Sequence, residues 1–279
     1  MHVTRFASKI STPSTISASV IQGSATGPVC FTTMSNLKPL HPSNELSAYA
    51  DDSYLIVPSI ASNTIPNELE HIKSWADSCN LRLNTNKSKE IIVRRRCSNV
   101  NNLPKPLESL ERVNTLNVLG VTFNEQLSFS EHVNSLIARG HQKLYALKIL
   151  RNHGLSNQIL YNTAFSLFTS IFTYASPAWS GFLLAKDINQ IDGIFKKAIK
   201  WGLLSPEHPP IRKVFEKSDH RLFNQVVGNR AHALHHLLPD RKIQYHTLRP
   251  RPHYYTLSSS LTTIQKHNFI YRMLFKDMY

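Results

Sequence analysis

Residues 44–57 read NELSAYADDSYLIV, in which hydrophobic residues flank two adjacent aspartates, Asp51 and Asp52. This pattern predicts two short strands that meet at a tight turn, with the aspartates at or beside its tip. A carboxylate pair on such a tip is exposed and held by its strands. Clustered carboxylates bind Mg²⁺, which can organise an attacking oxygen and a leaving pyrophosphate. Asp-Asp is also common at turns for conformational reasons alone, so the pair by itself leaves both interpretations open.

The residues that follow the hairpin predict a mixed α/β region. Apolar residues recur at helical spacing after Pro66 and stop at Asn80, which is typical of a helix with a proline in its first turn. Residues 81–96 (LRLNTNKSKEIIVRRR) predict a strand, a polar turn and a second strand. Residues 116–123 (LNVLGVTF) predict another β-hairpin, centred near Gly120.

The character of the chain then changes to helical. Apolar spacing predicts helices over 128–150 and 188–200. Between them, residues 152–185 contain no Lys, Arg, Asp or Glu, but their polar side chains share one stripe. This stripe favours a soluble, amphipathic, largely buried helix, ended by Pro177, over a membrane span. Further on, proline and histidine break the periodicity, and only residues 221–238 predict a helix.

The composition of the 279 residues restricts the class of protein. Lys and Arg number 32 and Asp and Glu 18, so the formal net charge is +14, with the largest excess over residues 201–279. An excess of this size favours polyanionic partners. Three widely spaced cysteines exclude a disulfide framework and a CxxC-type zinc site, and no apolar run reaches the roughly 18 residues of a membrane span. His232, His235 and His236 lack a nearby cysteine, which favours a partly buried polar face over a metal site.

Four motifs follow one another along the chain. They are QGSATGP at 22–28, YADD at 49–52, LNTNKS at 83–88 and LGV at 119–121. In this order and at these spacings the chain resembles the reverse transcriptases of non-LTR, LINE-type retrotransposons, from about Arg5 to the last residue. The resemblance implies an α+β fold. It consists of a truncated right-hand polymerase palm, an antiparallel sheet with packed helices, over 1–127, an all-α thumb-like region over 128–203 and an irregular basic C-terminal segment over 204–279.

The resemblance also implies roles for individual residues. Asp51 would be a metal-ligating aspartate for Mg²⁺ or Mn²⁺, and Asp52 its less strictly required neighbour. Lys87 would approach the triphosphate and could protonate the leaving pyrophosphate. The other implied contacts are with the incoming nucleotide and template base, through Gln22, Gly23 and Ser24, and with the primer, through Tyr49, Leu119 and Gly120.

RNA-directed DNA synthesis is the activity that the resemblance implies, with an RNA template, a DNA primer and deoxynucleoside triphosphates as partners and no membrane. In the family, a second essential aspartate lies well upstream of the QGS loop. Here the first acidic residue is Glu45 and the first aspartate is Asp51. We therefore expect the chain to be the C-terminal part of a longer polyprotein. We expect it to be inactive alone, because the loss of one member of a catalytic unit costs roughly 10⁴ or more in rate.

Two alternatives to a polymerase fragment stay open. The first is a non-catalytic nucleic-acid-binding remnant, in which the helical residues 128–202 and the basic tail keep affinity for a duplex through phosphate contacts. The second is a translated relic that does not fold stably, because an incomplete sheet exposes its edges. The resemblance implies a nuclear or cytoplasmic location, and the sequence does not indicate which proteins the chain binds.

Overall fold

The computed structural model describes residues 3–15, 36–95, 103–108, 110–242 and 253–276. The chain divides into two compact units, residues 1–87 and residues 88–279. The boundaries expected at residues 127 and 203 fall inside the second unit, and the palm, thumb and C-terminal divisions stay predictions.

The first unit contains the predicted hairpin. Strand β3 (Glu45–Tyr49) pairs antiparallel with β4 (Asp52–Ile56), and Tyr49 lies opposite Asp52. The two-residue turn between them begins at Ala50, whose φ of 49° lies in the left-handed region. The aspartates therefore occupy the last turn position and the first position of β4, which confirms the predicted tip. A second small hairpin, β1 (Arg5–Phe6) with β2 (Lys9–Ile10), precedes it.

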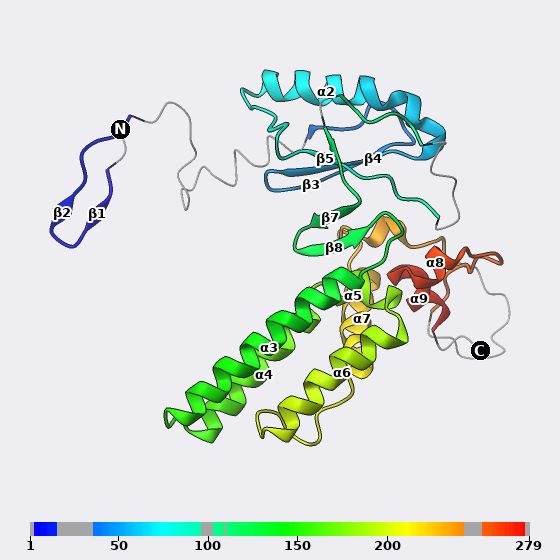
Figure 1. Cartoon of the computed structure of the whole chain (residues 1–279). Helices are drawn as coiled ribbons and strands as arrows, with labels where there is room; N and C mark the ends of the chain where they lie inside the picture. The colour runs from blue at the N-terminus through cyan, green and yellow to red at the C-terminus, as the bar shows by residue number, and fades with distance from the viewer. Residues whose placement is uncertain (1–2, 16–35, 96–102, 109, 243–252, 277–279) are drawn as a thin grey trace. The chain divides into compact units, whose positions relative to one another are not determined.

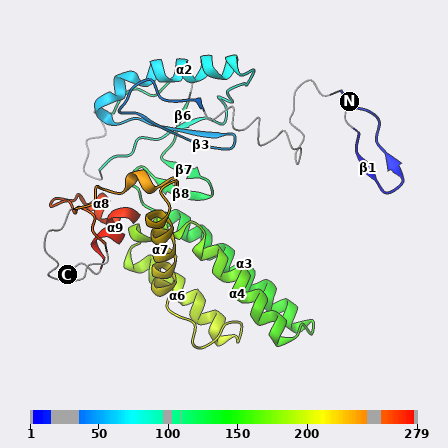
Figure 2. The ribbon, with the colours of Figure 1, turned by 180° about the vertical axis from the view of Figure 1, so that it is seen from behind.

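The predicted helix after Pro66 is confirmed as α2 (Ile65–Ser78), which follows the 3₁₀ turn η2 (Ser59–Thr64) and lies along the β3–β4 hairpin (Figures 1 and 2). Just beyond its C-terminus, Asn80 adopts a left-handed backbone conformation, with a φ of 57°. The Leu81 amide donates to the Ala76 carbonyl (2.8 Å), which is the bond of a Schellman cap. The strand predicted to start at residue 81 is therefore wrong, because the Leu81 amide is used to end the helix.

Two short sheets open the second unit. Strand β5 (Lys89–Glu90) pairs parallel with β6 (Glu111–Arg112), and β7 (Thr115–Val118) pairs antiparallel with β8 (Val121–Asn124). The β7–β8 turn is Leu119-Gly120, with φ of 49° and 84°. Positive φ at both positions is what a two-residue hairpin turn of type I′ needs, and glycine adopts it at the second position without strain. The hairpin predicted near Gly120 is confirmed.

The rest of the second unit is helical. Helices α3 and α4 form an antiparallel pair with α6 beside α3 (Figure 1). Helix α7 packs against α5 and against α6, which lies next to it in Figure 2. A core of Leu, Ile, Phe and Trp side chains joins them, with Phe168, Phe172 and Trp179 fully buried. The helices are α3 (Ser130–Asn152), α4 (Asn157–Thr173), α5 (Ser176–Trp179), η4 (Ser180–Phe182), α6 (Ala185–Lys200) and α7 (Ile211–Gly228).

Two helix predictions need correction. Pro177 does not end the uncharged helix, because α4 stops at Thr173 and Pro177 lies in the first turn of α5. The helix predicted over 221–238 begins ten residues earlier and ends at Gly228, since the backbone of Asn229 is extended. Among the residues described, no helix is both long and apolar enough to cross a membrane.

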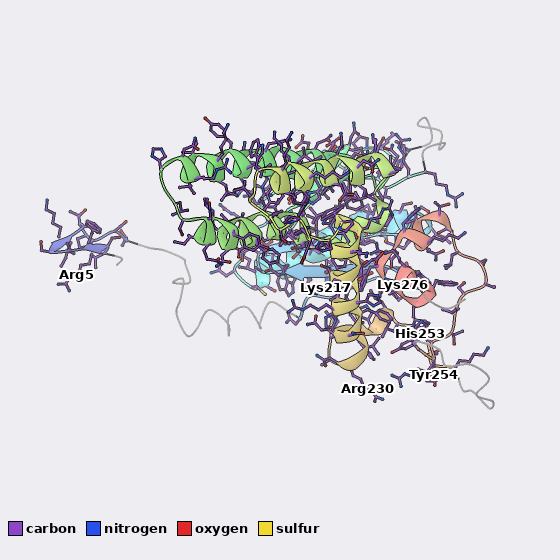
Figure 3. All side chains as sticks on the ribbon, turned by 90° about the horizontal axis from the view of Figure 1, so that it is seen from below. Arg5, Lys217, Arg230, His253, Tyr254 and Lys276 are labelled. Atoms are coloured by element: carbon purple, nitrogen blue, oxygen red, sulfur yellow. The ribbon has the colours of Figure 1, made fainter. Side chains whose placement is uncertain are left out.

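A second apolar cluster holds the end of the chain against α7. Helices α8 (Thr263–His267) and α9 (Phe269–Phe275) follow η5 (His235–Leu237), and α9 packs on the C-terminal half of α7. His253 lies between them (Figure 3): its ring packs on Phe223 of α7, and its Nε2 donates to the Leu274 carbonyl (2.8 Å). The basic segment before His253 is thus followed by an ordered, packed end.

Candidate functional site

The Tyr49–Asp52 turn presents its side chains to solvent. Asp51 and Asp52 are exposed, and Tyr49 is 64% exposed. None of the salt bridges in the described part of the chain includes either aspartate. Two adjacent carboxylates with no protein cation beside them are free to meet a hard cation, which prefers oxygen ligands.

The base of this hairpin is fastened by a buried carboxylate on α2. Glu68 is 1% exposed, and its Oε1 accepts from the His41 amide (2.8 Å) and the Asn44 side chain (2.9 Å). Its Oε2 accepts from the Leu40 amide (3.0 Å). Burial raises the pKa of Glu68, but these hydrogen bonds outweigh burial and hold the pKa below its ordinary value. Glu68 therefore ties the residues that lead into β3 to the helix as a carboxylate.

Sequence reasoning did not identify Glu68, although a signal was present. Glu68, Ile72 and Ala76 recur every four residues in α2, so the glutamate shares a helical stripe with apolar side chains. A carboxylate on such a stripe is seldom buried unless several donors meet it. The donors come from a segment more than 20 residues away and have no pattern of their own.

Lys87 lies in the polar turn that the sequence predicted. Its amide donates to the Asn84 carbonyl (3.1 Å) and to the Asn84 side chain (3.2 Å), and its own side chain is exposed. The hydrogen bonds and ion pairs of the described residues join Lys87 to neither Asp51 nor Asp52. The proposed role of its ammonium group stays a prediction.

The Leu119-Gly120 turn belongs to the second unit and rests on Tyr174. The Tyr174 hydroxyl donates to the Leu119 carbonyl (2.8 Å), and the Gly120 amide donates to Asn117 Oδ1 (3.1 Å). A Cβ on Gly120 would lie 3.5 Å from the Tyr174 ring. Tyr174, which follows α4, was missed because its contact spans 55 residues of sequence.

The remaining implied residues, Gln22, Gly23 and Ser24, lie outside the described residues. Within the described ranges, no group of three or more His, Cys, Asp or Glu side chains is placed to hold a metal ion. The donor type of Asp51 and Asp52 fits Mg²⁺ or Mn²⁺, whereas two adjacent carboxylates supply only part of the oxygen shell of either ion. The histidines at 232–236 form no such group and lie at η5 and in the turn before it, not on one helical face.

A cluster of cations surrounds Trp201 at the end of α6. The Lys197 and Lys148 ammonium groups lie 4.9 Å and 5.7 Å from the centre of the Trp201 ring, and Arg151 Nη1 donates to the Trp201 carbonyl (2.6 Å). None of these three cations forms a salt bridge in the part of the chain that the structure describes. We call Lys148, Arg151, Lys197 and Trp201 the tryptophan cluster.

The helices that carry the tryptophan cluster are basic beyond it. Helix α3 has no acidic residue after Glu131, and α6 has none after Asp192. The exposed cations along these stretches have no carboxylate partner among the described residues: Arg139, Lys143, Lys196 and Lys200. Carboxylates of the described residues therefore do not neutralise the positive charge of this surface.

About half of the chain is similar to RNA-directed DNA polymerases of mobile elements from Drosophila melanogaster. It is 24% identical over 148 residues to the RNA-directed DNA polymerase from mobile element jockey, which covers 49% of this chain and 16% of that protein. It is 29% identical over 154 residues to the probable RNA-directed DNA polymerase from transposon X-element, which covers 50% of this chain and 16% of that protein. The chain thus matches about a sixth of the length of these relatives.

No family model matches the chain. No solved structure matches it either. The two similarities confirm the resemblance to non-LTR reverse transcriptases that the four motifs indicated.

Proposed function

We propose that this chain is a part of a non-LTR reverse transcriptase and contributes to RNA-directed DNA synthesis, with an RNA template, a DNA primer and deoxynucleoside triphosphates. In this proposal residues 1–127 correspond to part of a right-hand palm, 128–203 to a thumb and 204–279 to a basic C-terminal segment. The observation that carries the proposal is the exposed Asp51-Asp52 pair at the tip of the β3–β4 hairpin, which forms no salt bridge within the described ranges. The similarity to two polymerases of mobile elements supports it.

The hairpin residues would act together at the reacting phosphates. Asp51 and Asp52 would hold a divalent cation, Mg²⁺ or Mn²⁺, which when bound stabilises the negative charge that develops on phosphoryl oxygens. Tyr49, opposite Asp52 and largely exposed, would lie against the primer end. The exposed Lys87 ammonium would donate to the triphosphate and give a proton to the leaving pyrophosphate. Glu68 would keep the tip in place by fixing the base of the hairpin.

We also propose that the 279 residues by themselves do not extend a primer. In the family that the chain resembles, a second essential aspartate lies upstream of the QGS loop, and residues 1–44 contain no carboxylate side chain. Removing one member of a catalytic unit costs roughly 10⁴ in rate or more. Asp51 and Asp52 would then bind a metal weakly without supporting turnover.

Two measurements test the catalytic part of the proposal. In a primer-extension assay on a homopolymer RNA template with Mg²⁺ or Mn²⁺, the chain is expected to give no extension. Extension that Asp51→Asn abolishes would contradict the proposed inactivity. In an NMR titration with Mn²⁺, line broadening is expected at residues 49–53, to be lost in Asp51→Asn and kept in Asp77→Asn, which removes an exposed carboxylate from α2. Equal loss of line broadening in both variants would contradict the assignment of the metal site to Asp51.

A second candidate function, binding of nucleic acid without chemistry, is favoured by the tryptophan cluster. Lys148 and Lys197 are exposed, lie over the Trp201 ring and form no salt bridge with any described carboxylate, which suits phosphate contacts. Lys197→Ala is expected to weaken duplex binding and to reduce the salt dependence by about one phosphate contact. Lys186→Ala, at the other end of α6, is the control. Affinity that does not change between low and physiological salt would contradict this function, as would equal effects of the two variants.

A further inference from the structure

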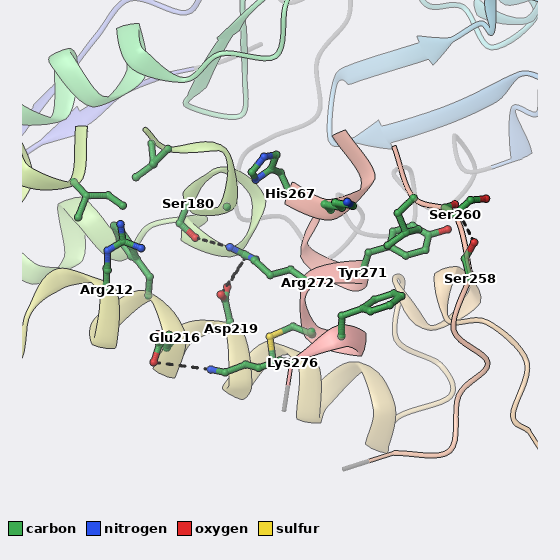
Figure 4. Close-up of a pocket in the computed structure, with 18 of the residues that line it drawn as sticks. Ser180, Arg212, Glu216, Asp219, Ser258, Ser260, His267, Tyr271, Arg272 and Lys276 are labelled. Atoms are coloured by element: carbon green, nitrogen blue, oxygen red, sulfur yellow. Dashed lines mark hydrogen bonds and ion pairs between the residues drawn. The ribbon is translucent and has the colours of Figure 1, made fainter. Parts of the chain in front are cut away.

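The second unit carries an open groove that neither of these functions uses. It has a volume of about 960 Å³ and lies between α7, the η4 turn, the segment 258–261 and helices α8 and α9 (Figure 4). A groove of this size can hold a small molecule or one to two residues of a polymer. Its walls come from both apolar clusters of the unit, so it is formed by packed elements.

The floor of the groove is an ion pair between a partly exposed arginine and a buried aspartate. Arg272 of α9 lies 3.2 Å and 3.1 Å from the two carboxylate oxygens of Asp219 on α7, and Asp219 is 5% exposed. The same guanidinium donates to the Pro177 carbonyl and to the Ser180 hydroxyl, both at 3.3 Å. Figure 4 shows Arg272 directed at Ser180 and Asp219. Both Nη atoms of Arg272 thus have partners within the protein.

The other carboxylate of the groove also faces a cation. Glu216 lies one helical turn from Asp219, and its oxygen is 3.9 Å from the Lys276 ammonium. Lys276 in turn donates to the His220 ring (2.9 Å). Each acidic side chain that lines the groove therefore faces a cation of the protein.

Two cations of the lining have no such partner. Arg212 on α7 and Lys266 on α8 are exposed, and the salt bridges of the described residues include neither. With Asp219 and Glu216 matched to Arg272 and Lys276, the groove keeps an excess of two positive charges. Charge-assisted hydrogen bonds to a phosphate are what unpaired guanidinium and ammonium groups form best.

The rest of the lining suits a ligand that is not only an anion. Three consecutive serines, Ser258 to Ser260, add hydroxyl donors, and Tyr271 adds a half-buried ring. Leu183, Ile188 and Phe215 make part of the wall apolar. A nucleotide combines a phosphate with a flat base that stacks on aromatic side chains.

We propose that this groove binds a phosphate-bearing nucleotide, with Arg212 and Lys266 as its phosphate donors. The nucleotide can be free or can be one residue of a single strand, because the shared chemistry is the same. The site lies wholly in the second unit and uses neither Asp51 nor the tryptophan cluster. A failure of this proposal therefore leaves the proposed function untouched, and the reverse also holds.

The test measures binding of two probes to the full chain. Deoxythymidine triphosphate is titrated by calorimetry, and a fluorescein-labelled eight-residue oligo(dT) is titrated by anisotropy. Arg212→Ala and Lys266→Ala are each expected to weaken the probe that binds by about tenfold, the value of one charge-assisted hydrogen bond. The matched controls are Lys213→Ala and Lys217→Ala, which remove exposed cations of α7 that do not line the groove.

The outcomes separate the two sources of the nucleotide. If Arg212→Ala and Lys266→Ala weaken binding of the triphosphate but the control variants do not, the groove is a site for the free nucleotide. If they weaken binding of the oligonucleotide only, the groove is a site for a strand. Equal loss in the lining and control variants would overturn the proposal, because net charge would then explain binding. Absence of binding by both probes would overturn it as well.

Discussion

Replacement of Glu68 by glutamine tests how the Tyr49–Asp52 hairpin is held. Glutamine keeps nearly the same size and changes one carboxylate oxygen into an NH₂ group. Oε1 accepts from two donors, the His41 amide and the Asn44 side chain, whereas Oε2 accepts only from the Leu40 amide. The least costly orientation therefore keeps the oxygen towards His41 and Asn44 and turns the NH₂ group towards the Leu40 amide.

The cost of Glu68→Gln follows from these three contacts. The Leu40 amide loses its acceptor and faces another donor, which costs about 1–3 kcal/mol for a buried group. The bonds from His41 and Asn44 change from charge-assisted to neutral, which removes further stability of about 1 kcal/mol. Relaxation of the segment offsets part of this loss, so we expect about 2–3 kcal/mol.

The assay is hydrogen exchange at the Leu40 and His41 amides, because both donate to Glu68. A loss of 2 kcal/mol in local stability speeds their exchange about 30-fold. Glu70→Gln is the matched control: the same change on the same helix at an exposed position, expected to stay within about 0.5 kcal/mol. Equal exchange in Glu68→Gln and the unaltered chain would refute the reasoning.

The pH dependence gives an independent check on the same residue. The folded pKa of Glu68 lies below its ordinary value of 4.5, because the hydrogen bonds outweigh burial. Its contribution is therefore fully present above pH 4.5 and is lost as pH falls through the folded pKa. The difference in unfolding free energy between the unaltered chain and Glu68→Gln should be largest at pH 6 and should shrink below pH 4.5. A constant difference over this range would contradict the carboxylate interpretation.

Three further predictions concern the second unit. In Gly181→Ala the new Cβ would overlap a backbone oxygen at the end of α8, so the free energy of unfolding should fall by about 2 kcal/mol. Gly193→Ala, whose Cβ would meet nothing within 4 Å, should stabilise α6 slightly. Guanidinium denaturation compares the two variants, and equal midpoints would contradict the packing at Gly181. Tyr174→Phe removes only the hydroxyl that donates to the Leu119 carbonyl and should cost about 1 kcal/mol, read as faster amide exchange in the β7–β8 hairpin; unchanged exchange would show that the bond does not hold the turn. Burial, with a nearby arginine, lowers the pKa of His132, so the neutral ring stabilises the fold above pH 6.5 and this contribution is lost as pH falls through the folded pKa. In His132→Phe the free energy of unfolding should therefore change less between pH 7 and pH 5 than in the unaltered chain. The same change with pH in both proteins would contradict this assignment.

Local patterns predicted the parts of the fold that local chemistry decides. The Asp51-Asp52 hairpin and the Leu119-Gly120 hairpin both follow from strand-forming residues on either side of a short turn. The helix from Pro66 follows from apolar spacing with a proline in its first turn. In each case the deciding interactions lie within a few residues, so the sequence signal and the structural cause are the same.

The errors arose where a distant or competing bond decided the outcome. The strand expected from Leu81 is absent because the amide of Leu81 caps the preceding helix. The helix expected to reach Pro177 stops at Thr173, after which Ala175 takes a left-handed conformation and a new turn begins. Tertiary packing of Trp179 under α7 favours that break, and no pattern within the segment announces it.

Each of the two motif turns is held by one side chain that is distant in the sequence. Glu68 fixes the residues before one hairpin from 24 to 28 positions away, and Tyr174 fixes the tip of the other from 55 positions away. Both are single side chains whose partners are mainly backbone groups, and a backbone group leaves no trace in a sequence pattern. A motif therefore identifies the residues that would meet a substrate, while the residues that hold it in place must be read from the fold. Comparison of Asp51→Asn with Glu68→Gln separates these roles, because the first should change metal binding without loosening the hairpin and the second should loosen the hairpin first.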